Sequence, residues 1–124
     1  MSDEISPPSW VTNEASWRKQ HKRMIAHAYD LIHGRMDLVE AARELRNYKF
    51  RLRLESDNKF LIFDVIDTQT DHLPIGKPRQ FWDKEALKIK DKELRSIETH
   101  YRDQALEAAR NIVARYEPIT RPHP

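Results

Sequence analysis

The sequence contains no cysteine and only two glycines, and both shortages narrow the possible functions. Without cysteine there can be no disulfide bond, no cysteine-ligated zinc and no thiol nucleophile. With only Gly34 and Gly76, the chain has little material for a glycine-rich phosphate loop or for tight hairpins. The remaining composition, 39% hydrophobic and 34% charged, is typical of a charge-rich helical protein.

Other signatures are missing as well. No apolar run approaches the roughly 20 residues that cross a bilayer, and the acidic, proline-bearing N-terminus does not resemble a signal peptide. We therefore expect a cytoplasmic protein with no membrane partner. A phosphate-binding loop, a zinc-protease motif and a nucleophile elbow are also absent, so we expect no enzyme, no cofactor and no metal site.

The chain has the size of a single domain, 124 residues. Pro7 and Pro8 oppose an early helix, and Pro118 and Pro122 oppose a late one. We therefore expect a flexible N-terminal arm over residues 1–11, one helical domain over residues 12–117 and a flexible tail over residues 118–124.

The longest predicted element is a helix from Asp83, its expected cap, to Tyr116. Its apolar residues recur at spacings of seven, three and four and form one stripe: Leu87, Leu94, Ile97, Tyr101, Ala105, Ala108, Ile112 and Tyr116. Neither glycine nor proline interrupts the pattern. The sequence predicts a mainly α-helical bundle organised on this one long C-terminal helix.

Two shorter helices precede it, one ending at about His33 before Gly34 and one beginning near Asp37. On the first, His21 lies beside the apolar stripe. We expect it to be partly buried and hydrogen-bonded, with a ligand or acid–base role as the alternative.

Residues 48–67 are compatible with two structures. Alternation of apolar and basic residues over 50–54, followed by a turn-prone segment at 56–59, is typical of a hairpin. Phe60, Phe63 and Ile66 recur every three residues, which is typical of a short helix capped by Asp57. We favour the helix and keep a small α+β fold with a hairpin at 48–67 as the alternative.

Charged residues gather in two regions that are candidates for binding. The second helix carries a basic arc over residues 43–53, formed by Arg43, Arg46, Lys49, Arg51 and Arg53. Residues 67–82 form the longest expected loop and contain Asp67, Asp71, His72 and Arg79. The simpler explanations are a solvated basic face and carboxylates that cap helices and turns.

Several landmarks together resemble a group of small, mainly helical bacterial proteins without an assigned function. The resemblance covers roughly residues 25–116 and is carried by Tyr29-Asp30-Leu31-Ile32-x-Gly34, Ala41-Ala42-Arg43-x-Leu45, Ile66-Asp67-x-x-x-Asp71-His72-Leu73-Pro74-x-Gly76-x-x-Arg79-x-x-Trp82 and Tyr101-Arg102-Asp103-x-Ala105. Proteins of this type are similar to immunity proteins that neutralise a co-produced toxin. The resemblance therefore implies a helical fold and a protein partner. Thr68-Gln69 stand where Ser-Glu is expected, which argues against a carboxylate-dependent site.

These observations favour a non-enzymatic protein-interaction module, in the form of an immunity-type inhibitor of a bacterial toxin. Its recognition surfaces would be the loop at 67–82 and the basic arc at 43–53. The first alternative is a nucleic-acid or phosphate-ligand binding protein that uses the basic arc. A hydrolase centred on Asp67, Asp71 and His72 is the second. A homodimer that buries Ile112, Val113 and Tyr116 is compatible with each of these functions.

Overall fold

The computed structural model describes residues 7–75 and 77–117. Within these residues the chain forms four α-helices, two short 3-10 helices and no strand: α1 (Glu14–Ile32), α2 (Leu38–Arg51), η1 (Asn58–Phe60), α3 (Leu61–Thr70), η2 (Lys77–Phe81) and α4 (Lys84–Tyr116). The predicted helical bundle with one long C-terminal helix is confirmed. The alternative hairpin at 48–67 is wrong.

The hairpin does not form because the apolar pattern of α2 continues through Tyr48 and Leu52, which are both buried. The chain then turns at Arg53, which has a left-handed φ of 54°. Amides of Arg53 and Leu54 donate to the carbonyls of Phe50 and Lys49, at 3.2 and 2.8 Å, and close the helix in a Schellman motif.

Gly34 closes α1 in the same way, with a φ of 71°. The glycine is the usual residue at this position, whereas an arginine there is uncommon because its Cβ crowds the backbone. The end of α1 was therefore predictable, and the end of α2 was not.

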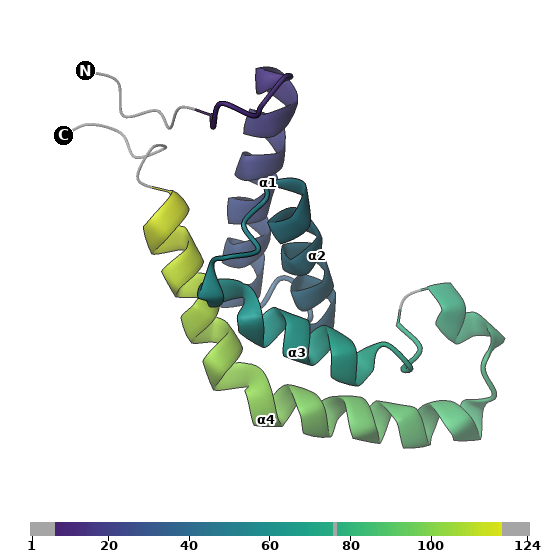
Figure 1. Ribbon diagram of the computed structural model, residues 1–124. Helices are drawn as coiled ribbons and strands as arrows, with labels where there is room; N and C mark the ends of the chain where they lie inside the picture. The colour runs from purple at the N-terminus through teal and green to yellow at the C-terminus, as the bar shows by residue number, and fades with distance from the viewer. Residues whose placement is uncertain (1–6, 76, 118–124) are drawn as a thin grey trace.

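The core lies where α1 and α2 pack against α3 and the C-terminal half of α4 (Figure 1). Phe60, Phe63 and Ile66 are fully buried, as their three-residue spacing predicted. On α4 the buried residues include Ala105, Ala108 and Ala109, whose small side chains let neighbouring helices approach closely. Tyr116 ends the helix beneath Phe60 and donates a hydrogen bond to Asp57.

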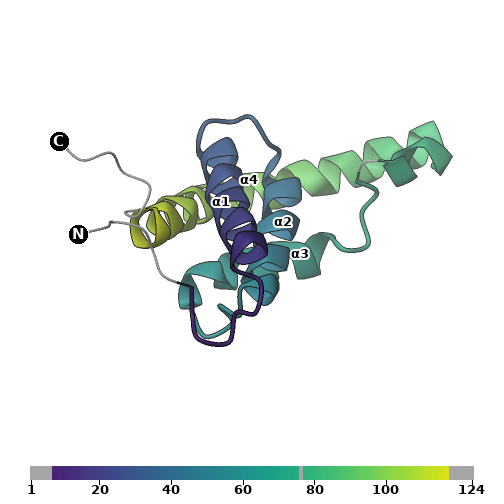
Figure 2. The same cartoon turned by 90° about the horizontal axis from the view of Figure 1, so that it is seen from above.

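The N-terminal half of α4 lies outside this core. Asp83 caps the helix as predicted, accepting hydrogen bonds from the amides of Glu85 and Ala86. From residue 84 to residue 104 no side chain is buried, and every buried residue of α4 falls between Ala105 and Tyr116. Figures 1 and 2 show this half projecting beyond α2 and α3, with η2 beside its tip.

This arrangement changes the expected role of the apolar stripe. Ile112 and Tyr116, which were expected to contact a second copy, are buried in the core of their own chain. Leu94 and Tyr101 are only partly buried at its edge. None of the helices in the described ranges combines the length and apolarity that a bilayer-spanning helix needs.

Candidate functional site

Cations of the basic arc, on α2, face the carboxylates of Asp64 and Asp67, on α3. Arg43 Nε lies 3.3 Å from Asp67 Oδ1, and Arg46 Nε lies 3.3 Å from Asp64 Oδ1 and 3.5 Å from Asp67 Oδ2. Lys49 Nζ donates to Asp64 Oδ2 at 2.5 Å. Because the three cations lie three residues apart on α2 and the carboxylates three apart on α3, the two rows match. We call these five residues the α2–α3 ion-pair cluster.

The expectation that Asp67 belongs to a loop over 67–82 is wrong, because α3 extends to Thr70. The buried Thr70 hydroxyl donates to the Ile66 carbonyl at 2.7 Å, and Arg43 Nη2 donates to the Thr70 carbonyl at 2.7 Å. These bonds satisfy the end of α3. Asp67 therefore contributes to helix packing and does not share a loop with His72.

The cations of the arc are engaged within the molecule. Lys49 is only 6% exposed, and its ammonium lies 4.5 Å from the centre of the Phe50 ring. The Arg46 guanidinium covers the same ring at 4.9 Å. A phosphate that bound here would have to displace these contacts, so the arc is first of all a link between two helices.

Two side chains of the segment between α3 and α4 pair with α4, and we call residues 71–75 and 77–82 of this segment the strap. Arg79 makes a bidentate pair with Asp91, with distances of 2.6 and 2.8 Å, and also donates to the Pro74 carbonyl at 3.2 Å. These bonds raise the pKa of Arg79 and lower that of Asp91. His72 Nε2 lies 2.8 Å from Glu93 on the same helix.

The predicted site residues are thus divided between two places. Arg43, Arg46, Lys49 and Asp67 meet in the ion-pair cluster, whereas His72 and Arg79 attach the strap to α4. Asp71 is exposed, 3.8 Å from His72 Nδ1. The structure does not bring Asp67, Asp71 and His72 together as a catalytic group.

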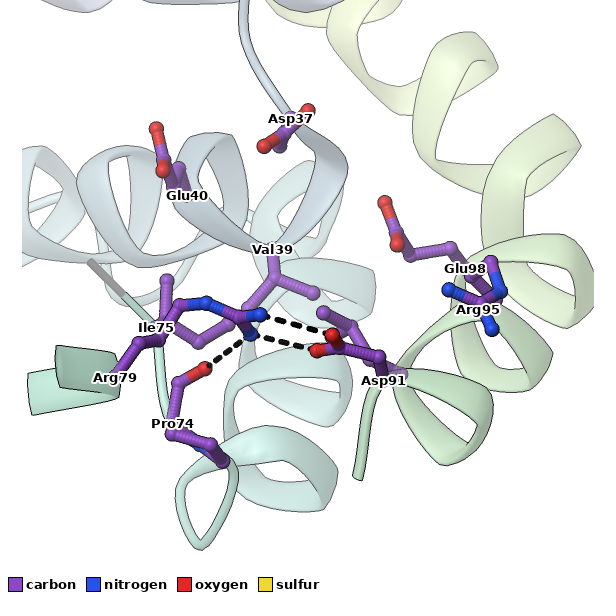
Figure 3. A pocket seen from close by; sticks show the side chains of 10 residues that line it. Asp37, Val39, Glu40, Pro74, Ile75, Arg79, Asp91, Arg95 and Glu98 are labelled. Atoms are coloured by element: carbon purple, nitrogen blue, oxygen red, sulfur yellow. Dashed lines mark hydrogen bonds and ion pairs between the residues drawn. The ribbon is translucent and has the colours of Figure 1, made fainter. Parts of the chain in front are cut away.

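A cavity of about 280 Å³ lies between the start of α2, the strap and α4 (Figure 3). Val39, Ile75 and Leu94 form its apolar side, and the Arg79–Asp91 pair spans it. Burial, together with the nearby Asp37 carboxylate, raises the pKa of Glu98 on its α4 wall. In the described residues no three His, Asp or Glu side chains are grouped so that they could hold a metal ion.

Two large apolar side chains stand out on the projecting part of the molecule. Phe81 is 82% exposed at the end of η2, and Ile89 is 69% exposed on α4. Trp82, which follows Phe81 in the chain, is 38% exposed, and Lys84, Lys88 and Lys92 are exposed on successive turns of α4. We call these six residues the extension surface.

None of the six residues of the extension surface was among the individual binding residues predicted from the sequence, although Phe81 and Trp82 lie in the predicted recognition loop at 67–82. The pairs that attach the strap to α4 are made by Arg79 and His72, and the Phe81 ring is left in solvent. Ile89 lies outside the apolar stripe that begins at Leu87. An apolar residue off the stripe of a solvent-exposed helix was the signal that could have found it.

His21 is buried on α1, but it is not hydrogen-bonded as expected. Its ring stacks on Trp17 at 5.1 Å and meets the edge of Tyr116 at 6.0 Å, and its Nε2 has no hydrogen-bond partner. Burial, with a smaller effect from the Arg18 charge, lowers the pKa of His21. The structure therefore favours the neutral imidazole at this position.

No protein-family model, no curated protein and no solved structure matches this chain.

Proposed function

We propose that this protein is a non-enzymatic helical interaction module that binds another protein through the extension surface. The observation that carries the proposal is the exposure of Phe81, at the end of η2, and of Ile89, on the part of α4 that has no buried side chain. Exposed apolar side chains on one projecting part of a protein are candidates for an interaction site when they form a patch. Aromatic residues of this kind are also frequent centres of binding energy in interfaces.

The charges near these residues indicate which charge the partner's surface carries. Lys84, Lys88 and Lys92 lie four residues apart, so they form one row along the helix. Glu85 pairs with Lys88 at 3.3 Å, but both side chains remain highly exposed, and such a pair is weak. A partner with an acidic rim around an apolar pocket would complement this surface and would associate rapidly.

The specific form that we propose is an immunity-type inhibitor of a bacterial toxin. A small helical core that holds a projecting recognition segment is suited to blocking a larger protein. The structure offers less support to the nucleic-acid alternative at the basic arc, since the arc's Arg43, Arg46 and Lys49 pair with Asp64 and Asp67.

The test is binding between the purified protein and the product of the gene adjacent to its own, measured by titration calorimetry. We expect binding that Phe81→Asp or Ile89→Asp weakens by about thirtyfold or more, as the loss of a central interface residue does. The matched control is Leu61→Asp, which introduces the same charge at an exposed apolar residue of a different helix. No binding, or binding that neither extension variant weakens, would contradict the proposal.

A further inference from the structure

Beyond the proposed function, we infer that the groove between α3 and α4 is the contact surface of a symmetric homodimer. The groove has a volume of about 490 Å³. Its apolar part is formed by Leu61, Ile62 and Val65 of α3 and by Ala108 of α4. Its rim is polar and consists of Asn58, Lys59, Gln104, Glu107 and Asn111.

The orientation of α3 explains why an apolar surface is left here. Half of its ten residues are apolar, but only Phe63 and Ile66 of these enter the core. Its carboxylates Asp64 and Asp67 point toward the cations of α2. Leu61, which is 60% exposed, and Val65 lie on the side of α3 that faces away from the buried Phe63 and Ile66. A helix that is apolar on two sides is normally covered on both.

The rim favours a second copy over an unrelated protein, because its charges complement each other. Lys59, whose Nζ lies 3.5 Å from Asp57 Oδ1 of its own chain and is still partly exposed, lies on the η1–α3 wall, and Glu107 lies on the α4 wall. A two-fold axis that exchanges these positions places each Lys59 against the Glu107 of the other copy. The three amides on the rim carry both donors and acceptors, so each can pair with its own kind. An isologous interface requires this kind of self-complementarity.

The extension surface does not meet this requirement. Its row of Lys84, Lys88 and Lys92 would bring like charges together if two copies paired there. The groove lies farther along α4, beside Ala108, where the outer side of the bundle is accessible. Self-association at the groove therefore leaves the extension surface uncovered.

The first experiment is sedimentation equilibrium of the full chain from micromolar to millimolar concentration. We expect a reversible monomer–dimer equilibrium and a dissociation constant that Leu61→Asp raises by about thirtyfold or more. Val65→Asp supplies a second variant, and circular dichroism melting checks that each variant folds. A monomer over the whole range, or a dimer that both variants leave intact, overturns the inference.

The second experiment tests the symmetry by exchanging charges. Lys59→Glu and Glu107→Lys should each weaken the dimer, because each creates two like-charge contacts. The double variant should restore it, and so should an equimolar mixture of the two single variants, since opposite charges then meet at both positions. Failure of both to restore association overturns the two-fold arrangement. A dimer lost on Phe81→Asp instead would place the contact at the extension surface and overturn the inference as well.

Discussion

At the scale of single residues, Lys49 shows how the charged groups of this protein contribute. Its ammonium is almost fully removed from water and is matched by Asp64 at 2.5 Å. An ammonium in such a position depends on its carboxylate, because an unpaired buried charge is strongly unfavourable. The residue therefore contributes to the joining of α2 and α3 only while Asp64 is present.

We therefore expect the loss of Asp64 and the loss of Lys49 to lower the free energy of unfolding by different amounts. We expect Asp64→Ala to lower the free energy of unfolding by about 2 kcal/mol, since it leaves Lys49 without its partner. Lys49→Met replaces the ammonium with an apolar group of similar length and should cost less. Urea denaturation measures both, with the exposed Asp71→Ala as the control, which should change stability little. Equal losses for Asp64→Ala and Lys49→Met would contradict this account.

We expect His21 to make the stability of the folded protein depend on pH. Burial lowers its pKa in the folded protein, so the unfolded chain binds the proton more readily. We expect the free energy of unfolding to be highest above about pH 7 and to decrease as the pH falls below the ordinary histidine value of about 6.5. The His21→Phe variant keeps a ring against Trp17 and should lose this part of the decrease. Chemical denaturation at a series of pH values measures the difference, and parallel curves for the two proteins would contradict it.

At the scale of elements, α4 is one helix with two environments. Its C-terminal half contributes all the buried residues of the helix, whereas residues 84–104 have only exposed or half-buried side chains. We expect backbone amides of residues 86–100 to exchange with deuterium faster than those of residues 105–116, because local opening there breaks few buried contacts. Hydrogen exchange followed by mass spectrometry measures this gradient along a single helix.

The strap should respond in the same experiment. Arg79→Gln removes the bidentate pair with Asp91, so amide exchange should increase across residues 77–82 and remain unchanged in α1 and α2. The comparison variant is Lys77→Gln, which changes a charge on η2 at an exposed position. Exchange that increases equally in both variants would show that the pair does not hold the strap.

Most helix ends could be predicted from the sequence, because each depends on residues that are close together in the chain. The cap at Asp83, the end at Tyr116 before Pro118 and the turn at Gly34 each depend on a few neighbouring residues. The pairing of Arg43 and Arg46 with Asp67 depends instead on how α2 and α3 pack, which no local pattern encodes. The left-handed Arg53 could not be anticipated either, because arginine has no preference for that conformation.

At the scale of the whole molecule, the two proposed surfaces lie on one helix but far apart. Ile89 and Ala108 are separated by 19 residues, or about 28 Å along the axis of α4. Residues at this separation that share no contacts usually have independent energetic effects. We therefore expect Phe81→Asp to leave the dimer dissociation constant unchanged and Leu61→Asp to leave partner affinity unchanged. Sedimentation and calorimetry on the two single variants and the double variant test this, and a non-additive double variant would contradict it.

The absence of buried side chains between residues 84 and 104 also affects how this part of the protein can evolve. An exposed residue of this segment, such as Ile89, contributes little to the core, so the requirement to fold restrains such positions weakly. Descendants of one ancestor could exchange Ile89 or the lysine row for other residues and acquire a different partner while keeping the same bundle. Among related chains, we expect residues 81–92 to diverge first and the positions beneath Tyr116 to diverge last.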